Sequence, residues 1–192
     1  MLSLDLVLFN NNILFKIHRF QWKSRQIHTY NLINGEIETL MINSGFNIPL
    51  FSRSIAIENG DIYLTGGQYK PYYLKACFLF DEGSNTLEKR ADMILPRGDH
   101  SLIYLAGCIY AIGSYTNNKT CERYSVMKNR WTMIAPMNVG RAGAGLCSFD
   151  NKYIYAFGGR NGKRTVLNAI ECYSIEKDVW KKVSFYHKII QI

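Results

Sequence analysis

Residues 62–67 read IYLTGG, and the same pattern returns as IYAIGS at 109–114 and as IYAFGG at 154–159. An arginine precedes each copy, and these arginines follow one another at intervals of 44 residues: Arg53, Arg97 and Arg141. A fixed period of this length is typical of a chain that stacks one supersecondary unit several times. The sequence therefore predicts an array of similar units.

Each unit is expected to contain four short strands. The apolar run that starts with Ile-Tyr fits a strand buried on both faces. It ends at a glycine pair, where the missing side chains permit close approach of another backbone. Asn-Gly pairs at 34–35, 59–60 and 161–162 are typical of type I′ turns, in which both central residues have a positive φ. We therefore expect an all-β fold of about four four-stranded sheets.

The expected units cover the whole chain, 1–192, as a single repeat region near residues 1–46, 47–93, 94–137 and 138–186. The first unit is degenerate. Its second, third and fourth strands are expected at 13–16, 26–31 and 36–40, with Ile17-His18 in place of the glycine pair and Ile37 in place of a later tryptophan.

The glycine pair is followed by an aromatic strand and by a tryptophan about 21 residues later. A stretch with Met and Pro then leads to the arginine that begins the next unit. This order resembles the kelch repeat, most closely over 135–180, and is similar to the blades of BTB–kelch proteins. Two departures are Leu87 in place of Trp and Gly113-Ser114 in place of Gly-Gly. The resemblance assigns structural roles to Gly66, Gly67, Trp131, Gly158, Gly159 and Trp180.

Kelch repeats form the blades of β-propellers, in which four-stranded sheets surround an axis. Kelch propellers usually have five to seven blades, so the resemblance implies a partial or unusually small ring here. Either four blades close tightly, or a second copy completes the ring by self-association, or the chain is part of a longer protein. An open ring would expose the apolar faces of its terminal blades.

The formal net charge of the chain is +8, and its basic residues are unevenly placed. In a propeller blade, the loops between second and third strands open on the same face as the loops between blades. These loops hold twelve basic residues but a single acid, Asp99. A face with this charge should attract acidic ligands.

BTB–kelch proteins are substrate-binding adaptors of cullin ubiquitin ligases, and this face of their propeller binds acidic peptides. The resemblance therefore implies a non-enzymatic protein-interaction module whose partner carries an acidic segment, held through Arg–carboxylate contacts. The expected partner-binding residues are Arg53, Ser54, Tyr69, Arg97, Asp99, Tyr115, Arg141, Arg160, Lys163 and Arg164. An alternative for the repeated arginines is a purely structural role, in which they bind backbone carbonyls at the blade junctions.

Parts of the sequence also fit two other functions. Basic loops with aromatic residues also suit single-stranded RNA, although no RNA-binding motif is present and nucleic acid is the less favoured partner. Some kelch-type propellers are metal-dependent enzymes, but the four histidines here have no ligand spacing. We expect no catalytic residue, no metal ligand and no cofactor. Five cysteines without a C-x-x-C pair, and no membrane-spanning stretch, favour a cytoplasmic protein with reduced thiols and no membrane partner.

Overall fold

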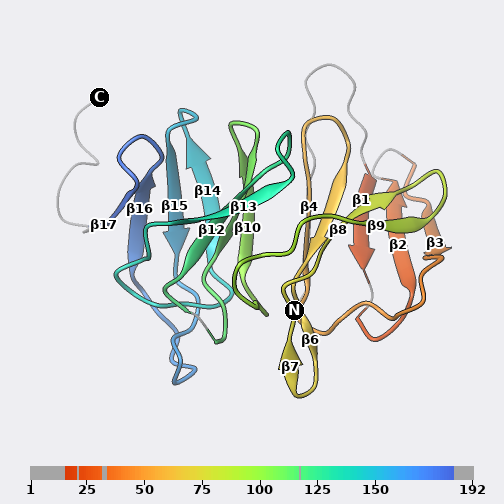
Figure 1. Cartoon of the computed structure of the whole chain (residues 1–192), viewed down its shortest axis with the longest axis horizontal. Coiled ribbons are helices and arrows are strands. Elements are labelled where there is room, and N and C mark those ends of the chain that lie inside the picture. Colours follow the sequence, from red (N-terminus) through yellow and green to blue (C-terminus); the bar gives the residue numbers. More distant parts are fainter. Residues whose placement is uncertain (1–15, 21, 32–33, 117, 184–192) are drawn as a thin grey trace.

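The computed structural model describes residues 16–20, 22–31, 34–116 and 118–183, and every regular element in them is a β-strand (Figure 1). A three-stranded sheet is made of β1 (Lys16–Phe20), β2 (Gln26–Asn31) and β3 (Ile37–Met41). The next sheet contains β4 (Arg53–Ala56), β5 (Ile62–Thr65), β8 (Cys77–Asp81) and β9 (Thr86–Lys89).

A third sheet contains β10 (Ser101–Leu105), β11 (Cys108–Ile112), β12 (Cys121–Ser125) and β13 (Arg130–Ile134). The fourth contains β14 (Gly145–Phe149), β15 (Tyr153–Phe157), β16 (Ile170–Ser174) and β17 (Val179–Val183). A small hairpin, β6 (Gln68–Tyr69) with β7 (Tyr72–Tyr73), projects from the second sheet between β5 and β8.

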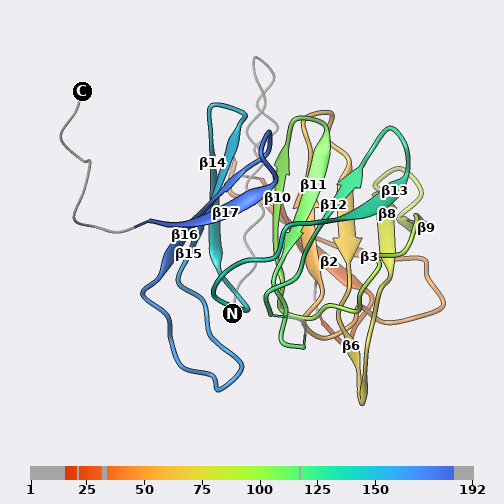
Figure 2. The same cartoon turned by 60° about the vertical axis from the view of Figure 1, so that its left-hand side comes forward.

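Within each sheet the strands are antiparallel and follow one another in chain order. The sheets stand face to face in sequence order, with β10 beside both β4 and β14 (Figures 1 and 2). This is the blade arrangement of a propeller, and it confirms the predicted fold class. Among the described residues, no helix is long and apolar enough to cross a bilayer.

The core lies between the sheets because the central strands are apolar on both faces. In β11, Tyr110 and Ile112 pack toward the fourth sheet, whereas Ile109 and Ala111 pack toward the second. Trp131 and its counterpart in the fourth sheet, Trp180, are buried. Each contacts a tyrosine of the neighbouring strand in a tilted arrangement, with ring centres 5.1 and 5.2 Å apart. Each sheet is therefore held mainly by the apolar faces of its neighbours.

The first sheet differs from its expected register. β2 and β3 lie close to the strands expected at 26–31 and 36–40. Ile17 and His18, expected to replace the glycine pair at a turn, instead lie inside β1, where they pair with Tyr30 and Thr29. Residues 13–15 of the expected second strand fall outside the described residues.

The turn type was also predicted wrongly at two places. At 59–60 only the glycine has a positive φ, of 94°, because the turn closes on Ile57 and the Asn59 side chain accepts the Asp61 N–H at 3.0 Å. Neither residue of the pair at 161–162 has a positive φ. There the Asn161 side chain accepts backbone N–H groups two and four residues later and shapes a wider loop.

Candidate partner-binding face

The loops that connect second to third strands and those that connect neighbouring sheets lie at one end of the sheets, the lower edge in Figure 1. We call this end the loop face. It consists of the described residues in 22–25, 47–52, 66–76, 94–100, 113–120, 135–144 and 158–169.

Backbone hydrogen bonds join these loops across the sheet boundaries. Leu50 and Gln68 exchange two, at 3.2 and 2.6 Å, and Ala142 and Arg160 exchange two at 2.9 Å. The Asp99 N–H donates to Phe51, and the Asp99 carbonyl accepts from Gly143. The loops therefore form one connected surface and hold their side chains in fixed positions.

Glycines after the second strands make this contact possible. A Cβ on Gly66 would lie 2.4 Å from the Arg97 carbonyl oxygen, and one on Gly113 would lie 2.1 Å from that of Arg141. Both glycines also have a positive φ, of 60° and 68°. The backbone of the next sheet boundary thus occupies the space that a side chain would need at these two positions.

Arg97 is fully buried and does not face a partner. Its Nη2 donates to Glu122 Oε1 at 2.9 Å, and its Nη1 donates to the carbonyls of Gly113 and Thr120, each at 2.8 Å. Glu122, also buried, accepts the N–H groups of residues 94 and 95. The expectation that Arg97 binds a ligand is therefore wrong, because its guanidinium N–H groups already donate to protein acceptors at the junction of two sheets.

Arg141 repeats this arrangement one sheet later. It is fully buried, and its Nη2 donates to Glu171 Oε2 at 2.7 Å. Its Nη1 donates to the carbonyls of Gly158 at 3.0 Å and Ala169 at 2.8 Å. Burial by itself raises the pKa of Glu171, but hydrogen bonds from Asn138, from the next backbone N–H and from Arg141 hold that pKa below its usual value. Arg141 is a structural residue, as the alternative held.

Two further candidates are largely withdrawn from the surface. Ser54 is buried within β4, because that strand is covered on both faces. Arg53 lies half-buried, where its Nε donates to the His100 carbonyl at 2.9 Å and its Nη2 pairs with Asp99. Arg53 is thus held by protein partners at the boundary between the second and third sheets.

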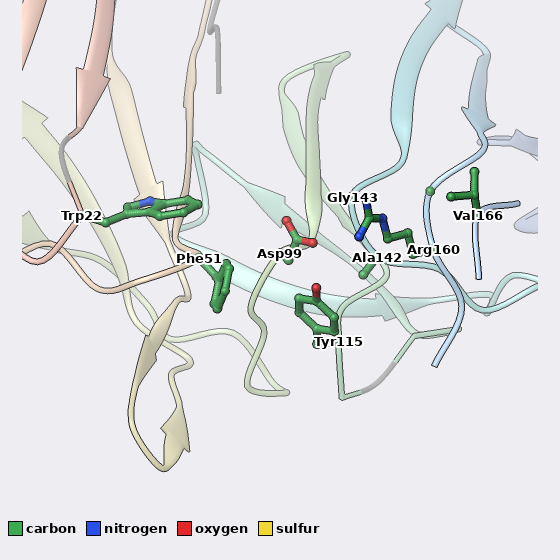
Figure 3. Close-up of a pocket in the computed structure, with 9 residues that line it drawn as sticks. Trp22, Phe51, Asp99, Tyr115, Ala142, Gly143, Arg160 and Val166 are labelled. Carbon is green, nitrogen blue, oxygen red and sulfur yellow. The ribbon is translucent and has the colours of Figure 1, made fainter. Parts of the chain in front are cut away.

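The loop face is hollowed at its centre into a basin of about 550 Å³ (Figure 3). Its lining residues are Trp22, Phe51, Asp99, Tyr115, Ala142, Gly143, Gly159, Arg160 and Val166. Trp22, Phe51 and Tyr115 form a continuous aromatic wall with edge contacts of 5.4 and 5.8 Å between ring centres. Loops from all four sheets contribute, so the basin exists only in the assembled array.

The basin also carries charge of both signs. Burial raises the pKa of Asp99, and the nearby Arg53 and Arg160 oppose that rise. Arg160 approaches Asp99 from the opposite side of the basin (Figure 3). The Arg160 side chain is exposed and makes no hydrogen bond to any residue that the structure describes. Its guanidinium is therefore available to a ligand carboxylate.

The remaining expected residues surround the basin. Tyr69 is exposed on β6, and its hydroxyl donates to the Asn47 carbonyl. Lys163 and Arg164 are exposed in the loop between β15 and β16. Other exposed cations on the loop face are Lys23, Arg25, Lys70, Lys75 and Lys119. Although Arg53, Arg97 and Arg141 are neutralised by carboxylates, the accessible charge of this face stays positive.

The structure adds Phe51 and Val166 to the predicted site. Phe51 has a φ of 61° and links the two other aromatic rings of the wall, and Val166 is 73% exposed at the rim. An apolar side chain in a polar loop is the one sequence signal that could have indicated Val166. Among the described residues, His, Cys, Asp and Glu side chains nowhere gather in threes as a metal site would require.

Residues 96–138 and 140–184 each match the family model of the Kelch motif. The chain is 28% identical to Kelch-like protein 25 of Xenopus tropicalis over 132 residues, which cover 62% of this chain and 22% of that protein. It is 28% identical to Kelch-like protein 36 of Bos taurus over 134 residues, 63% of this chain and 21% of the relative. With Kelch-like protein 23 of Homo sapiens the identity is 26% over 151 residues, 73% and 27% of the two chains. The match therefore spans about a quarter or less of each relative.

Proposed function

We propose that this chain is a kelch-repeat protein, since residues 96–138 and 140–184 match the Kelch motif, and that its loop face binds a segment of another protein without catalysis. The single observation that carries the proposal is the basin, where an aromatic wall stands opposite the exposed guanidinium of Arg160. Tyr, Trp and Arg side chains around a central pocket are the usual anchors of protein interfaces.

The exposed cations around the basin act first. Arg164 and Lys163 project from the loop between β15 and β16, and no exposed acidic side chain of the described loop face lies among them. Such a surface attracts acidic segments over about one Debye length, roughly 8–10 Å at physiological salt. Capture is therefore fast, and it weakens as salt rises.

The basin then selects the segment. An apolar or aromatic side chain of the ligand packs against Trp22, Phe51 and Tyr115, while a carboxylate accepts hydrogen bonds from Arg160. Asp99, which lies across the basin from Arg160, repels a second ligand carboxylate and instead accepts a hydrogen bond from a ligand N–H. The ligand is therefore a segment in which an acidic residue lies close to an apolar one. It binds with its chain in a single orientation.

The cellular role we propose follows from the resemblance to BTB–kelch blades. The bound protein is a substrate presented to a cullin ubiquitin ligase, with the ligase contact supplied outside the residues described here. A cytoplasmic site of action is part of the same proposal. It is supported by Cys77 and Cys121, which are free thiols in the structure.

The test is a selection of peptides from a random display library on the 192-residue protein, followed by calorimetry of the best peptide. We expect sequences that combine Asp or Glu with an apolar residue. The variant Arg160→Glu should weaken binding by about 10- to 100-fold. Lys128→Glu makes the same charge change in the β12–β13 turn, at the opposite end of the sheets, and should leave the affinity within about twofold.

A 20-nucleotide single-stranded RNA serves as the competing ligand in the same assay. Peptides without acidic residues, or equal effects of the two variants, would contradict the proposal. Tighter binding of the RNA, with a steep inverse dependence on salt, would assign the face to nucleic acid instead.

A further inference from the structure

The fourth sheet has one apolar face that no described residue of the chain covers. We call the side of a sheet that faces the next sheet along the chain its front face, and the other side its back face. On the fourth sheet the front face carries Phe149 from β14, and Tyr153, Tyr155 and Phe157 from β15. Tyr155 and Phe157 stack with their ring centres 6.4 Å apart.

The same positions are buried in the third sheet. By register, Phe149 corresponds to Leu105, and Phe157 corresponds to Ile112. Leu105 and Ile112 are 4% and 1% exposed beneath the fourth sheet, whereas Phe149 and Phe157 are 65% and 39% exposed. The front face of the fourth sheet thus has the composition of an interface between sheets but lacks the sheet that would cover it.

The first sheet has the complementary surface. In each interface of the array, the back face presents an aromatic residue opposite the tryptophan position: Tyr124 with Trp131, and Tyr173 with Trp180. In the first sheet, Tyr30 of β2 lies opposite Ile37 of β3 in the same register.

This back face is also exposed. Ile37 is 64% exposed and Met41, four residues later on the same side of β3, is 53% exposed. The described chain therefore ends in one unpartnered front face and one unpartnered back face.

We propose that a second copy of this chain covers both faces, with the fourth sheet of each copy packed on the first sheet of the other. The contact continues the interface that already joins neighbouring sheets within the chain, in which Tyr110 of one front face and Tyr173 of the next back face lie with their ring centres 6.3 Å apart. Two front faces placed together would oppose bulky Tyr155 side chains instead. Head-to-tail pairing avoids that clash, and two copies bring eight sheets together, within the four to eight blades of known propellers.

Large exposed apolar patches mark interaction sites in soluble proteins, which gives this assembly its driving force. A head-to-tail contact closes into a ring only if the rotation between copies returns to the start, and otherwise yields filaments. Closure by two copies is the form proposed here. It is independent of what the loop face binds.

The test is sedimentation equilibrium of the 192-residue protein between about 1 and 100 μM. We expect a mass twice the 22.1 kDa of the chain. Phe149→Asp on the front face and Ile37→Asp on the back face should each weaken association by at least about 30-fold. Met127 is 87% exposed in the turn between β12 and β13, and the control variant Met127→Asp should leave the association unchanged. Circular dichroism checks that each variant stays folded, which its exposed position favours.

Mixing the two defective variants decides the geometry. The intact front face of the Ile37→Asp chain should pair with the intact back face of the Phe149→Asp chain, so the mixture should form a one-to-one dimer. A monomer at 100 μM would overturn the proposal. Association that Phe149→Asp abolishes but Ile37→Asp leaves intact would overturn the head-to-tail arrangement, and an open series of masses would overturn closure by two copies.

Discussion

Replacing Arg141 by alanine should destabilise the array rather than merely weaken ligand binding. The substitution leaves the Glu171 carboxylate fully buried without its ion pair. It also leaves the carbonyls of Gly158 and Ala169 without the donors that reach them at 3.0 and 2.8 Å. Removing one partner of a buried ion pair costs about 3–5 kcal/mol. For a domain of this size, that loss lowers the melting temperature by about 6–20 °C.

The measurement is urea unfolding followed by tryptophan fluorescence, since Trp180 lies at the same sheet interface. Arg130→Ala, which removes an exposed arginine of β13, is the matched control and should change the free energy of unfolding by less than about 0.5 kcal/mol. Adding Glu171→Gln to Arg141→Ala should recover part of the loss, because the buried charge is then gone. Equal stability of Arg141→Ala and the control would refute the structural role.

Three other outcomes follow from the packing and the buried groups. Gly113→Ala should lower the free energy of unfolding by about 2 kcal/mol or more, because its φ is 68° and the new Cβ would meet a carbonyl oxygen at 2.1 Å. Gly145→Ala, with open space around it, should lower the free energy of unfolding little. Chemical denaturation compares the two variants. His100 is fully buried, and its burial, together with the two nearby arginines, lowers its pKa well below 6.5. Because the unfolded chain then takes up the proton first, stability should fall as pH drops below about 6.5, by up to about 1.4 kcal/mol per pH unit. The variant His100→Gln should flatten this part of the pH profile. A thiol reagent at neutral pH should label Cys147, on the front face of the fourth sheet, in the folded Phe149→Asp monomer, where that face is uncovered. It should reach Cys121, whose pKa burial raises to about 12, only after denaturation, as peptide mass spectrometry would record.

The repeat made the fold class predictable from the sequence. Its spacing identified the central strands, and the sheets built on residues such as Ile109 and Ile154 follow that spacing. Because the same unit occurs several times, a weak strand signal in one copy is supported by the signals at the same position in the other copies. The first unit lacks that support, and there the expected position of Ile17-His18 was wrong because the strand extends further along the chain.

The role of the repeated arginines could not be read from their own positions. Arg97 pairs with a glutamate 25 residues later and Arg141 with one 30 residues later, and only the fold brings each pair together. A signal was nevertheless present, since Glu122 and Glu171 occupy the same repeat position. The matching residue of the second sheet is Phe78, which explains why Arg53 turns instead to Asp99.

The basin was only partly predictable because it combines loops from four sheets. Residue type and loop position identified Tyr115 and Arg160, which depend little on exact geometry. Phe51 was missed because its place between two other rings depends on the approach of neighbouring loops.

The most direct test of the proposed basin is photo-crosslinking with the acidic peptide obtained by selection. Val166 at the rim of the basin, 73% exposed, is replaced by p-benzoylphenylalanine, and Met127, 87% exposed in the turn between β12 and β13, is replaced in a control protein. We expect the peptide to crosslink to the protein labelled at 166, and we expect Arg160→Glu to abolish the crosslink. Equal crosslinking from positions 166 and 127 would contradict it.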